Sequence, residues 1–126
     1  MSIRAMCCAF DVTPRTLRFY EQKDLLFPIR DGQKRLFTRR DRARLTLILR
    51  GRKFGVGLEE IRQLLDLYDM EGQKHVQLQK SIETGKRRLA EMIGQRAALD
   101  AGVAELRVLL ADGEKMLYAE KAQSAA

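Results

Sequence analysis

Basic side chains able to bind phosphate groups are concentrated in one part of this chain. Residues 13–53 hold 13 Lys and Arg against 4 Asp and Glu, whereas residues 71–126 hold 9 against 8. Side chains at this density attract DNA, because binding releases the counterions condensed on its backbone. Charge alone is compatible with three kinds of partner: nucleic acid, a membrane surface and an acidic protein. The sequence motifs must distinguish among them.

Residue types that catalyse reactions or bind metals are sparse. The chain has one histidine, His75, and two adjacent cysteines, Cys7 and Cys8, which cannot close a disulfide loop. On a helix these cysteines lie about 100° apart, so both cannot face one metal ion without distortion. We expect Cys7 to pack in a core and His75 to be a polar loop residue, and we predict no enzyme activity, no metal site and no cofactor.

The hydrophobic pattern contains no segment suited to a membrane. No stretch approaches the ~18 apolar residues of a membrane span, and the first residues lack the apolar run of a signal peptide. We therefore expect a cytoplasmic protein without a membrane partner.

A capped helix carries the first group of basic side chains. Thr13 suits an N-cap and Pro14 the first helical position, so a helix is predicted over residues 14–23, after a short apolar helix and a turn. This order is typical of a helix-turn-helix, although a surface helix of an ordinary bundle is an alternative of similar weight. Close to the start of the second helix, and able to meet a major groove, lie Arg15, Thr16 and Arg18.

A basic hairpin is predicted next. Asp31-Gly32 separates two short strand-forming segments after Pro28, and Lys34 and Arg35 follow the turn. A plain charged connector is the alternative. The order of capped helix, proline and basic hairpin favours a wing, with Lys34 and Arg35 reaching phosphates or the edge of the minor groove.

Two more helices complete a head over residues 1–70. Residues 39–52 form an amphipathic helix whose polar face is strongly basic, and residues 54–57 end it. A further helix opens at Leu58, with acidic residues near its start and an apolar stripe that includes Leu64 and Leu65.

The strings TPRTLRFYEQKDLL, GQKRLF and RRDRARLTLILRGRKFGVGLEEIRQLL resemble the head of the MerR family through about residue 69. The resemblance implies that DNA is contacted by Arg18, Phe19 and Tyr20 from the recognition helix. It also implies contacts by Arg35 from the wing and by Arg52 from the end of the helix that follows the wing. The family more often has Tyr where this chain has Phe19, so we expect Phe19 to pack. The family's turn glycine is Asp11 here, a residue that tolerates left-handed geometry.

The rest of the chain is predicted to form one long helix that dimerises. A series with alternating spacings of four and three is apolar at eight of its ten positions: Leu78, Ile82, Leu89, Met92, Leu99, Val103, Leu106 and Leu110. Gly85 and Arg96 interrupt it. We therefore predict a mainly α fold, with a winged helix-turn-helix head (residues 1–70), a dimerisation helix (residues 74–112) and a short tail (residues 113–126). By resemblance, the dimer is an antiparallel coiled coil.

The resemblance also implies partners and a mechanism. We expect a homodimer that binds a palindromic operator in double-stranded DNA, bends and untwists it, and thereby lets RNA polymerase engage the promoter. A non-regulatory architectural protein and simple repression by occlusion are the alternatives. DRARLTLILRGRKFG followed by LLDLYD is similar to MerR-type regulators of leucine, isovalerate and related acyl-CoA catabolism, which suggests a small-molecule effector. Thiol-based metal sensing is not expected, because no cysteine lies near either end of the long helix.

Overall fold

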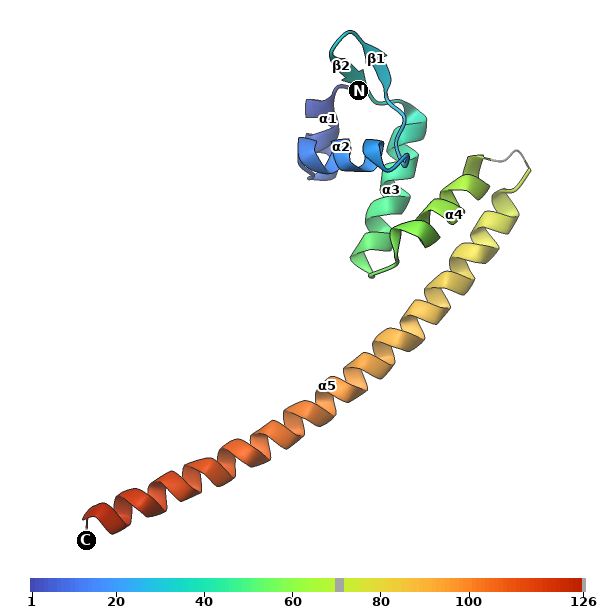
Figure 1. Ribbon diagram of the computed structural model, residues 1–126. Helices are drawn as coiled ribbons and strands as arrows, with labels where there is room; N and C mark the ends of the chain where they lie inside the picture. The colour runs from blue at the N-terminus through green and yellow to red at the C-terminus, as the bar shows by residue number, and fades with distance from the viewer. Residues whose placement is uncertain (70–71, 126) are drawn as a thin grey trace. The chain divides into compact units, whose positions relative to one another are not determined.

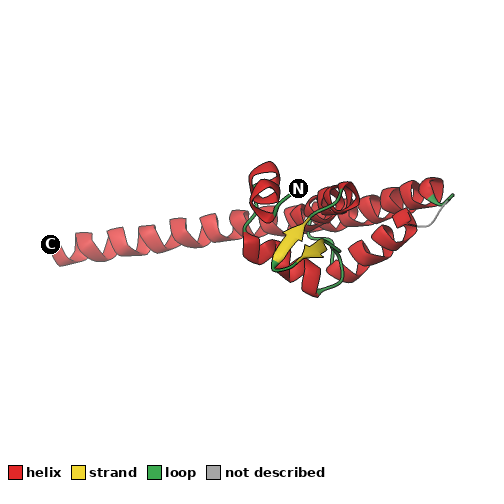
Figure 2. Cartoon of the chain, turned by 90° about the horizontal axis from the view of Figure 1, so that it is seen from above, coloured by secondary structure: helices red, strands yellow, loops and turns green. Residues whose placement is uncertain are grey.

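A computed structural model describes residues 1–69 and 72–125, and the chain divides into two compact units, residues 1–85 and 86–126. The mainly α fold is confirmed (Figures 1 and 2). In chain order the elements are α1 (Ile3–Phe10), α2 (Pro14–Gln22), β1 (Ile29–Asp31), β2 (Lys34–Leu36), α3 (Arg39–Lys53), α4 (Leu58–Asp69) and α5 (Lys74–Ala125).

The turn between α1 and α2 has the geometry of a helix-turn-helix. Asp11 adopts the left-handed conformation, with φ +53°, as expected for a residue that replaces glycine here. Thr13 then caps α2, because its side-chain oxygen accepts the N–H of Thr16 at 3.2 Å, and Pro14 starts the helix. The local signals read from the sequence therefore place this helix correctly.

The hairpin forms through a two-residue turn between β1 and β2. Its antiparallel register pairs Asp31 with Lys34 and Arg30 with Arg35. Gly32 supplies the positive φ, +64°, that the first position of such a tight turn requires. The start of the chain joins the hairpin as well, since the backbone of Met1 exchanges hydrogen bonds with that of Phe37. That long-range pairing is absent from the sequence-based prediction.

One apolar core holds the helices of the first unit together. It draws side chains from every helix of the head and from the segments around the hairpin: Met6, Leu17, Tyr20, Leu25, Leu26, Phe37, Leu45, Ile48, Ile61 and Leu65. Gly51 lets α3 and α4 approach closely, because a Cβ at this position would lie 2.8 Å from Cδ1 of Ile61. The core fixes α2 relative to the hairpin, and these are the two elements expected to meet DNA.

A buried polar pair connects α3 to the segment between α2 and the hairpin. Asp41 accepts the backbone N–H of Phe27 at 2.9 Å and completes a capping box with Thr38. Arg44 donates from Nε to the carbonyl of Leu25 at 2.7 Å, and its guanidinium lies 5.2 Å from the centre of the Phe27 ring. Both residues are 1% exposed, so Arg44 does not contribute to the basic polar face predicted for residues 39–52. The hydrogen bond from Arg44 to the Leu25 carbonyl offsets part of the cost of burying the guanidinium group.

The long helix is confirmed, but it does not end near residue 112. α5 continues to Ala125, so the predicted tail is helical. Gly113 costs about 1 kcal/mol in a helix, and the strong helix formers on both sides of it outweigh that cost. Within the first unit, α5 contacts α4: Gln77 donates to the carbonyl of Leu64 at 3.2 Å, and the Thr84 hydroxyl lies 3.5 Å from Glu60 Oε1.

Candidate nucleic-acid interface

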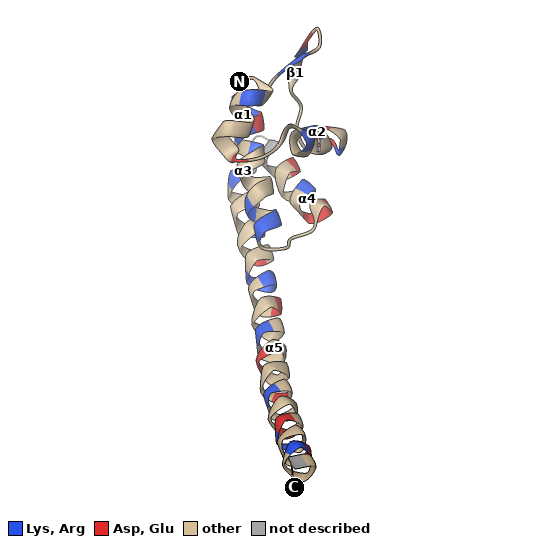
Figure 3. Cartoon of the chain, turned by 90° about the vertical axis from the view of Figure 1, so that its left-hand side faces the viewer, with Lys and Arg blue, Asp and Glu red and all other residues tan. Residues whose placement is uncertain are grey.

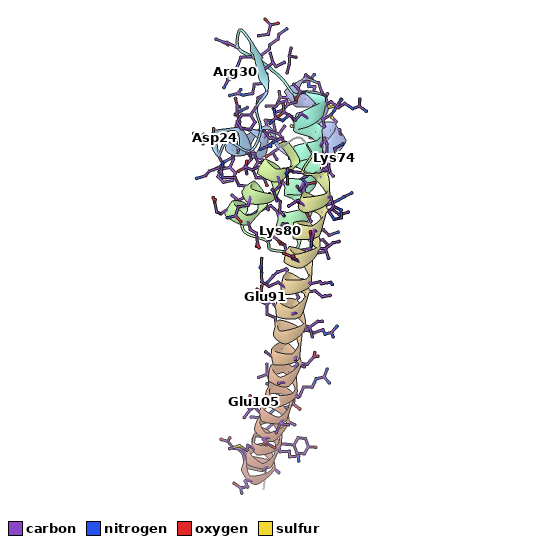
Figure 4. All side chains as sticks on the ribbon, turned by 90° about the vertical axis from the view of Figure 1, so that its right-hand side faces the viewer. Asp24, Arg30, Lys74, Lys80, Glu91 and Glu105 are labelled. Carbon is purple, nitrogen blue, oxygen red and sulfur yellow. The ribbon has the colours of Figure 1, made fainter. Side chains whose placement is uncertain are left out.

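Helix α2 and the hairpin border an open hollow of about 730 Å³. Four of the side chains around it are arginines and two are acids, so the surface is basic: the lining residues are Arg15, Arg18, Phe19, Glu21, Gln22, Asp24, Arg30 and Arg35. Figure 3 shows Lys and Arg on α2, the hairpin and α3, and Figure 4 labels Arg30 on the hairpin and Asp24 after α2. Segments separated in sequence therefore supply one polar surface that fits an anionic partner.

Of the polar residues on α2 that were predicted to contact DNA, two are exposed and one is hydrogen-bonded within the helix cap. Arg15 and Arg18 are exposed and line the hollow, where their guanidinium groups are accessible to DNA. Thr16 is half-buried and shares a 2.9 Å hydrogen bond with the hydroxyl of Thr13. The structure thus gives Thr16 a role in capping the helix.

The aromatic pair behaves differently from the expectation. Tyr20 is 6% exposed and belongs to the core, and its contact with DNA, implied by resemblance, stays a prediction. Phe19, expected to pack, is 41% exposed and has the Lys23 ammonium 5.7 Å from its ring centre. Adjacent helical positions lie about 100° apart, and Tyr20 shares the buried face with Leu17, three residues earlier. The Tyr20 ring therefore faces the core, and the Phe19 ring lies at the edge of the buried face.

The wing residues are held by an acid that sequence reasoning missed. Lys34 is exposed, as expected for a phosphate contact. Arg35 donates from Nε to Glu21 Oε2 at 2.7 Å, while Arg30, which was not predicted as a site residue, donates to Glu21 Oε1 at 3.0 Å. The sequence offered only a basic hairpin and one acid on the preceding helix. Their meeting depends on how the hairpin packs against α2.

Arg52 does not border the hollow between α2 and the hairpin. It is exposed in the last turn of α3 and is not among the side chains that line the hollow. Its contact with DNA, implied by resemblance, stays a prediction.

The predicted dimerisation stripe is exposed to solvent in the single chain. All eight of its apolar side chains have exposed fractions between 38% for Met92 and 68% for Leu99: Leu78, Ile82, Leu89, Met92, Leu99, Val103, Leu106 and Leu110. A regular apolar stripe of this length is typical of a coiled-coil seam.

The cysteines and the histidine form no cluster with one another. Cys7 packs partly against the core, Cys8 is exposed, and His75 is exposed in the first turn of α5, not in a loop as expected. Across residues 1–69 and 72–125, no group of three or more His, Cys, Asp or Glu side chains is close enough to hold a metal ion. No helix in this described part is long and apolar enough to cross a membrane.

A helix-turn-helix followed by a basic hairpin, both bordering one basic hollow, defines a winged helix-turn-helix DNA-binding protein. The family model "MerR HTH family regulatory protein" matches residues 1–67, and the model "MerR, DNA binding" matches residues 42–109. The chain belongs to the MerR family, and it is a DNA-binding transcriptional regulator. Members of this family regulate transcription and are not enzymes.

Curated relatives and a solved structure agree with this assignment. A ZntR homologue of Haemophilus influenzae, described as an HTH-type transcriptional regulator, is 29% identical over 85% of this chain and 81% of its own. The regulator ZntR of Escherichia coli K12 is 41% identical over 45% of this chain and 42% of its own. The transcription regulator PbrR691 of Ralstonia metallidurans CH34, solved with lead(II), gives a TM-score of 0.55 at 32% identity, covering 85% and 84% of the two chains.

Proposed function

We propose that this regulator is a homodimer that binds a palindromic operator through α2 and the hairpin of each head and controls transcription by bending and untwisting promoter DNA. The basic hollow between α2 and the hairpin is the observation that carries this proposal. A helix that presents exposed arginines near its start suits base edges in a major groove, and a hairpin with an exposed lysine suits the neighbouring phosphates.

The apolar stripe on α5 supports the homodimer. Fully burying one leucine side chain contributes roughly 1.5–3 kcal/mol, and the stripe offers eight large apolar side chains in each copy. A second copy presents the same stripe with the same spacing, and packing the two together buries both at once. We therefore propose a coiled-coil dimer, antiparallel by analogy with the family, in which each head meets one half-site.

Control of transcription then depends on how the heads are held. Arg62 of α4 donates to the carbonyl of Lys23 at the end of α2, and α4 in turn contacts the start of α5. Displacement of α4 would therefore affect the recognition helix. From the sequence, we propose residues 54–58 and residues 70–73 as the hinges that would carry such a change. Met70 and Glu71 lie outside the described residues. A small-molecule effector and a role in branched-chain acyl-CoA catabolism remain predictions.

Lys34→Ala tests the wing. Because Lys34 is exposed beside the hairpin turn, we expect its loss to weaken binding to operator and to random DNA by similar factors. The slope of log K against log salt should flatten by roughly one unit for each protomer, since one phosphate contact is lost. Salt titrations of both DNAs measure this. Lys121→Ala, which removes an exposed lysine from α5, is the control, and an unchanged slope for Lys34→Ala would exclude Lys34 from the interface.

DNA distortion tests the regulatory mechanism. We expect a circular-permutation gel shift to show a bent operator, and chemical probing to show hypersensitive bases at its dyad, in at least one effector state. A bend of this kind costs of order 1–6 kcal/mol, offset by contacts at both half-sites. RNA polymerase would then engage the realigned promoter. Straight DNA without hypersensitivity in every state would leave repression by occlusion, and protection that spreads beyond one site would indicate an architectural protein.

A further inference from the structure

Glu21, on the recognition helix, contacts both strands of the hairpin at once. Its Oε1 accepts from Nη2 of Arg30 on β1 at 3.0 Å, and its Oε2 accepts from Nε of Arg35 on β2 at 2.7 Å. Arg30 and Arg35 face each other in the register of the hairpin. One carboxylate therefore joins α2 to both sides of the wing.

The burial of these side chains separates this cluster from an ordinary surface ion pair. The side chains of Glu21 and Arg35 are 19% and 22% exposed, so solvent screens their interaction only in part, whereas Arg30 is 54% exposed. Each carboxylate oxygen of Glu21 accepts from one of the two arginines. Each of these contacts uses one nitrogen of a guanidinium that carries five N–H donors, so both arginines retain donors for an anion.

A carboxylate on the DNA-facing side of a recognition helix is unfavourable by itself, because it repels phosphates. It becomes useful when it holds cationic side chains in place. Arginine loses considerable rotamer freedom when it binds, and a side chain already oriented in the free protein loses less. The hairpin is also short, with three residues in each strand, and depends on contacts with α2 to keep its position.

We propose that Glu21 is a positioning residue that locks the wing to the recognition helix and orients Arg30 and Arg35 toward the DNA backbone, and that Arg30 is a further DNA-contacting residue. The inference rests on the proposed use of the α2–hairpin hollow in DNA binding. The distance between the major-groove contacts of α2 and the backbone contacts of the wing is thereby set before DNA arrives, which favours the operator over other sequences.

Glu21→Gln in the full-length protein tests the positioning role, because it keeps the shape of the side chain and removes its charge. We expect affinity for the operator to fall about tenfold while affinity for random DNA stays the same or rises, since a repelling charge has gone. Glu83→Gln is the matched control: Glu83 pairs with Lys80 on α5, at 3.5 Å, and its loss should leave both affinities unchanged. Equal increases for both DNAs would show that Glu21 only repels DNA and would overturn the proposal.

A double-mutant cycle separates positioning from a general loss of structure. In a protein that already carries Arg30→Ala and Arg35→Ala, Glu21→Gln should change operator affinity less than about twofold, because Glu21 acts through these two side chains. An unchanged tenfold loss in that background would overturn the proposal.

Arg30→Ala tests the second part without disturbing the core, since Arg30 is more than half exposed. We expect weaker operator binding and a salt slope flattened by roughly one unit for each protomer. Unchanged affinity and slope would remove Arg30 from the interface. If Lys34→Ala weakens binding as expected while the variants at positions 21 and 30 do not, the proposed interface stands and this inference alone fails.

Discussion

Leu99→Asp should convert the protein from a dimer to a monomer. Leu99 lies in the middle of the stripe on α5 and is the most exposed of its eight apolar side chains, at 68%. Losing the burial of one leucine costs roughly 1.5–3 kcal/mol, and a symmetric dimer loses it twice, so the dissociation constant should rise at least about 100-fold. The carboxylate adds to this loss, because it would be buried in the seam without a partner.

Light scattering at micromolar protein measures this effect directly. Ala101→Asp is the matched control: it places the same carboxylate on the same helix about 200° around the axis from Leu99, where Ala101 is exposed. The control should remain a dimer. A monomer mass for the unmodified protein, or a Leu99→Asp dimer as tight as the original, would contradict the proposed seam.

Arg18→Ala should abolish most of the discrimination between operator and random DNA. Arg18 is exposed on α2 and lines the hollow beside the wing. A bidentate arginine contact with a base is worth about 1–3 kcal/mol of discrimination, and a dimer makes two such contacts, so specificity should fall by about 100-fold. Affinity for random DNA should fall much less, because most of the basic surface remains.

Competition binding on a footprinted operator and a random fragment of equal length measures this ratio. Arg107→Ala, which removes an exposed arginine from α5, controls for the loss of one positive charge. Normal operator binding by Arg18→Ala would show that α2 is not the recognition helix. This test is independent of the dimer test, because Arg18→Ala should leave the mass in solution unchanged.

The sequence by itself was sufficient for features set by neighbouring residues. Thr13 and Pro14 start α2 because a cap and its first turn involve only four consecutive positions. Gly32 marks the hairpin turn because its positive φ is a local requirement. The apolar stripe on α5 could be predicted because the helical period repeats along a single element. The MerR resemblance combined these local signals, and the family models confirmed it.

The tertiary structure decided which side chains of these elements are free and which are engaged. The resemblance favours packing for Phe19 and a DNA contact for Tyr20, yet the core takes Tyr20 and leaves Phe19 exposed. Arg44 reads as one more basic surface residue until the carbonyl of Leu25, nineteen positions away, is brought to it. Glu21 reads as an isolated acid until the hairpin folds onto α2. Each outcome depends on contacts between elements, and a pattern within one element does not contain that information.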